Sequence, residues 1–150
     1  MSGRPSSVLF VCSENALRSP MAEALTKDRF GTDIFVDSAG VRDGDLDPIA
    51  IAVLDEIGVD LSRHKSKRLD DLMDTSFEVI VTLSPEAQHK AIEATRVIAS
   101  DVEYWPTPDP SVAEGHRDAR LAAYRDLRDY LIGRIEERFG CREGDEDQKP

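Results

Sequence analysis

The sequence predicts an α/β fold in which helices cover both faces of a parallel sheet. Three short runs, Val8 to Cys12, Ile34 to Ser38 and Glu78 to Leu83, are apolar and rich in β-forming residues, and each precedes a stretch with helical spacing. This alternation is typical of three-layer α/β/α proteins, which bind ligands at the carboxyl ends of the strands. The 150 residues suffice for one domain with its own core. We expect that domain at residues 1–140 and a disordered acidic tail at 141–150.

The helices of the first two thirds of the chain are marked by their ends. A helical pattern begins near Pro20, which is tolerated in a first turn because its missing N–H has no partner there. Asp47 and Pro48 predict the cap and first position of a second helix, and Gly58 its end. Ser84, followed by a proline, predicts the cap of a third.

The last third of the chain contains less strand signal and one long helix. A short fourth strand is expected at Val97 to Ala99. A proline-rich loop from Tyr104 to Gly115 follows, in which Trp105 is as well suited to packing as to ligand contact. The apolar residues of the terminal helix recur at helical spacing and share one face: Leu121, Tyr124, Leu127, Leu131, Ile135 and Phe139.

Charge and cysteine content restrict the partners and the compartment. The formal net charge is -11, which disfavours nucleic acid and anionic membranes as partners. The run from Val8 to Cys12 is too short for a signal or membrane segment. Cys12 and Cys141 lie in unlike settings that do not resemble a disulfide framework, so we expect a cytoplasmic protein.

The basic segment and the histidines are assigned no chemistry. The segment from Arg63 to Arg68 favours a solvated loop, although it could also steer anionic substrates. His64, His89 and His116 lack metal-ligand spacing, so we expect surface or capping roles and no metal site.

The loop between the first strand and the first helix carries the strongest chemical signal. Cys12 ends the strand and Arg18 follows six positions later. A turn of this kind can direct several backbone N–H groups into one concavity, which then binds an anion. The helix N-terminus and Arg18 favour the thiolate form of Cys12, and Arg18 can bind two oxygens of a phosphate-like group. The residues expected to bind the substrate are Ser13, Glu14, Asn15, Ala16, Leu17 and Ser19.

Attack by Cys12 on a phosphoryl or arsenate group requires a proton for the leaving oxygen. Asp109, between two prolines that stiffen its loop, is the candidate general acid, and Ser19 can donate a hydrogen bond to the departing sulfur. A structural interpretation also exists, because cysteine is often a small buried hydrophobe and Asp-Pro an ordinary turn.

These motifs resemble those of the low-molecular-weight protein tyrosine phosphatase family. The resemblance rests on "VCSENALRS", the late "DP", "DSAG" (Asp37 to Gly40), "DP.A" (Asp47 to Ala50) and "GVDLSRHKSKRL" (Gly58 to Leu69). It covers nearly all of the chain before the tail. It implies a phosphatase-I-like fold with a four-stranded parallel sheet between helices, and no metal or organic cofactor.

The resemblance also implies a role for each residue of the motif. Cys12 would form a phosphocysteine, Arg18 would bind the phosphate, and Asp109 would act first as acid and then as base. Asn15 would hold the unusual backbone of the loop, and Ser19 would support the thiolate.

Several positions depart from the family pattern. Glu14 stands where family members usually carry glycine, and Leu17 where a second cysteine is frequent; we expect the Glu14 side chain to point to solvent. No aromatic residue occurs in "GVRDGDLD", and Ser111 and Val112 follow the late "DP", so the aromatic wall of tyrosine phosphatases is missing.

The middle of the chain is more similar to thioredoxin-coupled arsenate reductases. Their third strand ends in "VTLC", with another cysteine seven residues later, whereas this chain has Ser84 and Ala91 at those positions. A relay of three thiols cannot operate without both cysteines.

Three hypotheses follow. The first is a cysteine-dependent phosphatase acting on phosphomonoesters, including those of phosphoproteins, as a monomer or weak homodimer. The second is an arsenate reductase in which an external thiol partner, or less readily Cys141, resolves the adduct on Cys12. The third is an oxyanion-binding or adaptor protein without catalysis.

Overall fold

The computed structural model describes residues 4–72, 76–95 and 100–140. Its centre is a four-stranded parallel sheet in the order β2-β1-β3-β4. The strands are β1 (Ser7–Cys12), β2 (Phe35–Gly40), β3 (Val79–Thr82) and β4 (Asp101–Tyr104). The predicted parallel α/β/α architecture is confirmed.

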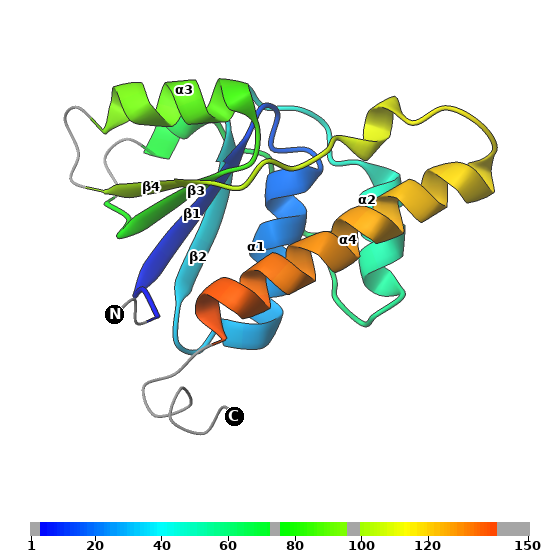
Figure 1. Ribbon diagram of the computed structural model, residues 1–150, viewed down its shortest axis with the longest axis horizontal. Helices are drawn as coiled ribbons and strands as arrows, with labels where there is room; N and C mark the ends of the chain where they lie inside the picture. The colour runs from blue at the N-terminus through cyan, green and yellow to red at the C-terminus, as the bar shows by residue number, and fades with distance from the viewer. Residues whose placement is uncertain (1–3, 73–75, 96–99, 141–150) are drawn as a thin grey trace.

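Helices cover both faces of the sheet (Figure 1). On one face lie α1 (Arg18–Phe30), α2 (Pro48–Asp55) and α4 (Arg117–Phe139), and on the other lies α3 (Pro85–Ala94). Two short 3-10 helices, η1 (Leu69–Leu72) and η2 (Pro110–Val112), complete the structure. No helix in the described part of the chain is long and apolar enough to cross a membrane.

The alternation of side chains along β1 divides the core in two. Val8 and Phe10 point into the larger cluster, beneath α1, α2 and α4, whereas Leu9 and Val11 point into the smaller cluster beneath α3. Because β1 lies inside the sheet and is buried on both faces, its sequence from Val8 to Cys12 is a continuous apolar run. Its carboxyl end, at Cys12, is therefore held inside the buried core.

Most predicted helix starts are confirmed. Asp47 caps α2 by accepting a hydrogen bond from the Ile49 amide, and Ser84 caps α3 in the same way from Ala87. Helix α1 begins at Arg18, with Pro20 in its first turn. Helix α2 ends at Asp55, three residues before Gly58, which has a positive φ of 78° in the turn that follows.

The end of the chain is also largely as expected. Five of the six predicted apolar residues of α4 are buried, and Leu121 packs partly buried at the edge. Trp105 is buried, with its ring 5.7 Å from that of Phe10 and 6.0 Å from that of Phe139. The strand expected at Val97 to Ala99 lies outside the described residues, as does the tail 141–150; β4 lies at Asp101–Tyr104.

Candidate active site

The loop from β1 to α1 is held in place by hydrogen bonds that its carbonyl groups accept from the β2–α2 connection. Arg42 donates its amide hydrogen to the Ser13 carbonyl (2.9 Å), and Asp47 donates its own to the Ala16 carbonyl (2.9 Å). Within the described chain, the amide N–H groups of residues 13–17 donate to no acceptor. The loop thus presents a run of free donors at the N-terminus of α1, the arrangement that binds a phosphate-like anion.

Cys12 lies at the base of this loop next to Ser19. Its Sγ is 2.9 Å from the Ser19 Oγ, and both side chains are buried. Ser19 Oγ also accepts a hydrogen bond from the Asn15 Nδ2 (2.8 Å), and its one hydroxyl hydrogen is shared between the nearer sulfur and the Ala39 carbonyl at 3.3 Å. The geometry allows Ser19 to stabilise a thiolate.

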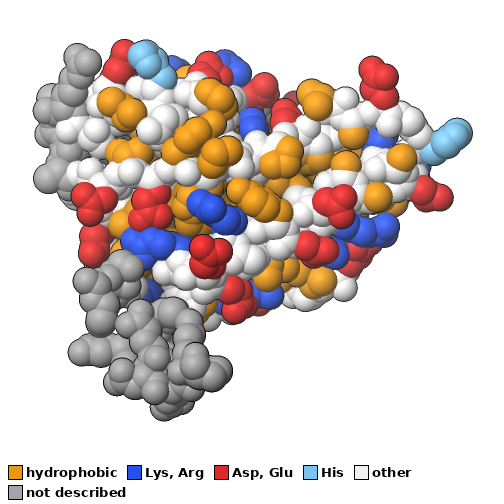
Figure 2. Space-filling view, viewed as in Figure 1, with side chains coloured by type: hydrophobic (Ala, Val, Ile, Leu, Met, Phe, Trp, Pro, Cys, Tyr) orange, Lys and Arg blue, Asp and Glu red, His pale blue; other side chains and the backbone are white. Residues whose placement is uncertain are grey.

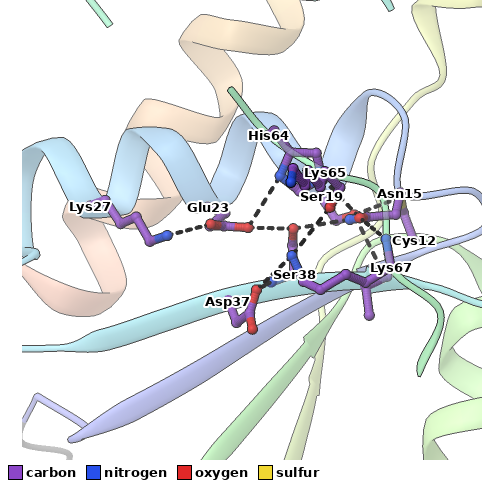
Figure 3. Close-up of polar contacts among 11 residues, drawn as sticks. Cys12, Asn15, Ser19, Glu23, Lys27, Asp37, Ser38, His64, Lys65 and Lys67 are labelled. Atoms are coloured by element: carbon purple, nitrogen blue, oxygen red, sulfur yellow. Dashed lines mark hydrogen bonds and ion pairs between the residues drawn. The ribbon is translucent and has the colours of Figure 1, made fainter. Parts of the chain in front are cut away.

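Asn15 is the centre of a buried polar network behind the loop (Figure 3). It has a positive φ of 32°, which asparagine tolerates better than most residues. Its Nδ2 donates to Ser19 and to Ser38 (3.0 Å), while its Oδ1 accepts from the Lys67 amide (2.9 Å) and from the His64 Nε2 (2.9 Å). Four hydrogen bonds therefore hold this strained residue in one orientation.

His64 is not on the surface, and the expectation of a surface or capping role is wrong. Only 6% of its side chain is exposed, and its Nδ1 lies 3.6 Å from the Glu23 Oε1. The hydrogen bond from the Lys67 amide identifies the Asn15 Oδ1 as the amide oxygen, which carries no hydrogen. Toward His64 this oxygen can therefore only accept, so the imidazole proton is on Nε2. Burial lowers the pKa of His64, and the Glu23 carboxylate offsets only part of that effect.

Glu23 and Ser38 extend the network toward the surface. Ser38 donates its hydroxyl hydrogen to the Glu23 Oε1, and Glu23 pairs with Lys27 one helical turn later (Figure 3). The sequence places Ser38 at the end of a predicted strand and in the "DSAG" motif, but neither Ser38 nor Glu23 was predicted to have a role in the site. The available signal was a glutamate on the apolar face of α1, four positions after Ser19, where a carboxylate needs buried partners.

Gly40 allows the end of β2 to approach the loop closely. A Cβ atom at this position would lie 2.5 Å from the Asn15 amide nitrogen and 2.3 Å from the Arg42 carbonyl oxygen. No side chain fits there without moving backbone. The glycine of the "DSAG" motif is therefore part of the construction of the loop.

The loop forms the floor of a cavity of about 720 Å³. One wall comes from the β2–α2 connection and the start of α2, and the other from η2 and the first turn of α4. Cys12 and Arg18 lie on the floor with Asp109 in the second wall, and their side chains share this space. The remaining lining residues are Ser13, Glu14, Ala16, Leu17, Arg42, Asp45, Leu46, Asp47, Pro48, Ile49, Ser111 and Arg120.

Arg18 and Asp109 are both held at the carboxyl edge of the sheet. Arg18 Nη1 donates to the Thr107 carbonyl (3.0 Å), which links α1 to the proline-rich loop. Asp109 caps η2, its Oδ1 accepting from the Ser111 amide (2.9 Å) and hydroxyl (2.6 Å). Its other carboxylate oxygen takes no hydrogen bond within the described chain.

The six residues expected to bind substrate fall into two groups. Ser13, Glu14, Ala16 and Leu17 line the cavity, whereas Asn15 and Ser19 are fully buried behind it. The Glu14 side chain is 59% exposed, with its Oε2 3.9 Å from the Arg42 Nη2.

Among the described residues that line this cavity, none is aromatic. The histidine, cysteine and carboxylate side chains of the described segments form no group of three that could hold a metal ion.

A family model of low molecular weight phosphotyrosine protein phosphatases matches residues 7–130. The chain belongs to this family. Its members are enzymes, both phosphatases and arsenate reductases. The arsenate reductase of Bacillus subtilis (strain 168) is 30% identical over 130 residues, covering 87% of this chain and 92% of the relative.

Two solved structures illustrate both activities found in this phosphatase family. One is an arsenate reductase in the phosphate binding state, which is 27% identical with a TM-score of 0.69. The match covers 95% of that structure and 88% of this chain. The other, a low molecular weight protein tyrosine phosphatase from T. tengcongensis, is 25% identical with a TM-score of 0.73, with 95% of it and 87% of this chain covered. The comparisons therefore establish the family, and its members include both phosphatases and arsenate reductases.

Proposed function

We propose that this family member is a cysteine-dependent phosphatase that hydrolyses phosphomonoesters through a phosphocysteine intermediate. One observation carries the proposal: Cys12, hydrogen-bonded to Ser19 beneath a loop of free amides, shares one cavity with Arg18 and Asp109. This set contains a nucleophile, an anion site, a cationic fork and an acid.

In the first step the Cys12 thiolate attacks phosphorus, so that a P–S bond forms as the P–O bond to the leaving group breaks. The free oxygen of the Asp109 carboxyl group delivers the proton to the leaving oxygen. The loop amides and the Arg18 guanidinium bind the equatorial oxygens, whose charge rearranges in the transition state.

In the second step a water molecule replaces the leaving group. Asp109, now a carboxylate, accepts a proton from this water. At the same time the water oxygen attacks phosphorus and the P–S bond breaks. Cys12 leaves as a thiolate, to which Ser19 donates a hydrogen bond. Phosphate is released, and the enzyme returns to its starting state.

Arsenate reduction remains the second candidate because the curated relatives are named arsenate reductases. At the two positions of the relay cysteines this chain has Ser84 and Ala91. Ser84 caps α3, with its Oγ 3.0 Å from the Ser13 Oγ, and Ala91 is a buried residue of α3. Cys12 is the one free cysteine of the described residues. Reduction by this chain would therefore need an external thiol, or Cys141 in the tail.

The deciding experiment compares the turnover of para-nitrophenyl phosphate with arsenate-dependent thiol consumption. We expect hydrolysis that is abolished in Cys12→Ser and strongly reduced in Asp109→Asn, with phosphate binding retained in both. Cys141→Ala is the matched control and should hydrolyse like the wild type. Arsenate reduction without hydrolysis of the phosphate ester would contradict the phosphatase proposal and support the arsenate reductase function. Inactivity in both assays with phosphate bound would support a non-catalytic oxyanion-binding protein.

A further inference from the structure

Charged side chains line much of the cavity, and most are occupied by partners inside the protein. Arg42 donates to the Glu86 Oε2 (2.6 Å), a contact that lowers the pKa of Glu86. Asp47 accepts from the Ile49 amide and, through its second oxygen, from the Tyr124 hydroxyl (2.7 Å). These groups are held in the wall and are not free to recognise a substrate.

Arg120 differs from the other two arginines of the cavity. It lies in the first turn of α4, is half-buried, and lines the cavity, yet its side chain has no hydrogen bond or ion pair with any described residue. A cation near the N-terminus of a helix is opposed by the helix dipole, so this position does not stabilise α4. A half-buried guanidinium without a partner in the protein is available to bind an anion in the cavity.

The position of Arg120 is on the side of the leaving group. It shares a wall with Asp109, the group proposed to protonate the leaving oxygen, and with Ser111. Burial and the hydrogen bond to Asp47 raise the pKa of the Tyr124 hydroxyl, and the charges of Arg120 and Asp109 add smaller effects of opposite sign. A substrate with its phosphate on Cys12 would extend its leaving group past this wall.

We propose that Arg120 determines specificity by binding a second anionic group, a carboxylate or a second phosphate, on the leaving group of the substrate. This inference rests on the proposed phosphatase function and deepens it. The missing aromatic wall agrees with it, because a leaving group that no ring holds by stacking needs another point of attachment. A guanidinium supplies one by donating two parallel hydrogen bonds to a carboxylate or phosphate.

The opposite wall carries a competing feature. Asp45 also lines the cavity without a partner among the described residues, and it could attract a cationic leaving group instead. Asp45 is exposed, however, whereas Arg120 is half-buried. The field of a half-buried charge is less screened by water, so the anionic leaving group is favoured.

The test uses two aryl phosphates that differ in one charge: 4-(carboxymethyl)phenyl phosphate and its carboxamide. We expect the wild type to favour the carboxylate in kcat/KM by about tenfold, the order of one charge-assisted hydrogen bond. Arg120→Gln should lose this preference because kcat/KM falls more for the carboxylate than for the carboxamide, and Arg120→Lys should retain part of it. Arg117→Gln removes an exposed arginine from the same turn of α4 and should behave as the wild type.

The outcomes separate the two proposals. Equal hydrolysis of both esters by the wild type, a preference that survives in Arg120→Gln, or an equal loss on both esters in that variant would overturn the assignment of Arg120 alone. A wild type that hydrolyses neither ester would overturn the phosphatase function and this inference with it. A third ester, carrying a phosphonate in place of the carboxylate, shows which of the two anions the site prefers.

Discussion

Replacing Asn15 with alanine should destabilise the whole protein as well as the loop. The substitution removes four hydrogen bonds, two buried and two part-buried, and leaves two donors, the Lys67 amide and the His64 Nε2, without an acceptor. Each donor left unpaired away from water costs about 1–3 kcal/mol, and the lower part of that range applies to part-buried groups. Alanine at a φ of 32° adds about 1 kcal/mol of backbone strain. After relaxation of the loop, we expect a loss of about 3–5 kcal/mol in the free energy of unfolding.

Urea denaturation followed by tryptophan fluorescence measures this loss. The chain contains one tryptophan, Trp105, which is buried against Phe10 and Phe139, so its emission reports the global transition. Asn15→Gly is the matched control. It removes the same hydrogen bonds but tolerates the positive φ, so it should be about 1 kcal/mol more stable than Asn15→Ala.

Two results would refute this reasoning. An unfolding free energy of Asn15→Ala within about 0.5 kcal/mol of the wild type, the ordinary range of a surface substitution, would show that the network contributes nothing to stability. Equal stability of the alanine and glycine variants would show that the backbone at this position is not strained.

Three further predictions concern the loop, the thiol and a surface ion pair. Gly40→Ala should abolish phosphate binding measured by calorimetry, because the new Cβ would overlap loop backbone. Gly133→Ala is the control: its Cβ would lie in open space within α4, so urea denaturation should show a gain of about 0.5–1 kcal/mol in stability. Ser19→Ala should slow hydrolysis of the phosphocysteine, so that stopped-flow assays show a larger burst of nitrophenolate before a slower steady state; an unchanged burst would argue against thiolate stabilisation. The hydrogen bond from Arg125 lowers the pKa of Glu56 to about 2, so its contribution to stability is present above about pH 4.5 and declines as the pH falls toward 2. The stability difference between the wild type and Glu56→Gln should shrink over that interval, and a difference independent of pH would contradict the assignment.

The parts of the fold that were predictable are those with local causes. Asp47 and Ser84 each precede a proline and cap a helix, and both signals lie within three residues of the helix they start. Strand β4 lacked such a signal. Its sequence, Asp101–Tyr104, is polar and lies at the edge of the sheet, where no side chain is fully buried. Its position is set by pairing with β3, which no local pattern records.

The same distinction applies to the site. The spacing of Cys12, Arg18 and Ser19 was informative because one loop positions all three. His64 was misjudged because its partners, Asn15 and Glu23, lie 49 and 41 positions away in the sequence. A histidine among polar neighbours looks exposed until the fold brings a buried carboxylate and an amide to it.

The need for this hidden network follows from what the loop must do. Amides that are to bind an anion cannot be used to hold the loop itself, so residues 13–17 gain little from their own N–H groups. The stabilisation must come from the opposite side, through the carbonyls bound by the β2–α2 connection and through the side chain of Asn15. Preorganisation of the anion site is therefore a property of the tertiary structure. A substitution at Ser38 or His64, which do not line the cavity, should for this reason weaken phosphate binding and stability together.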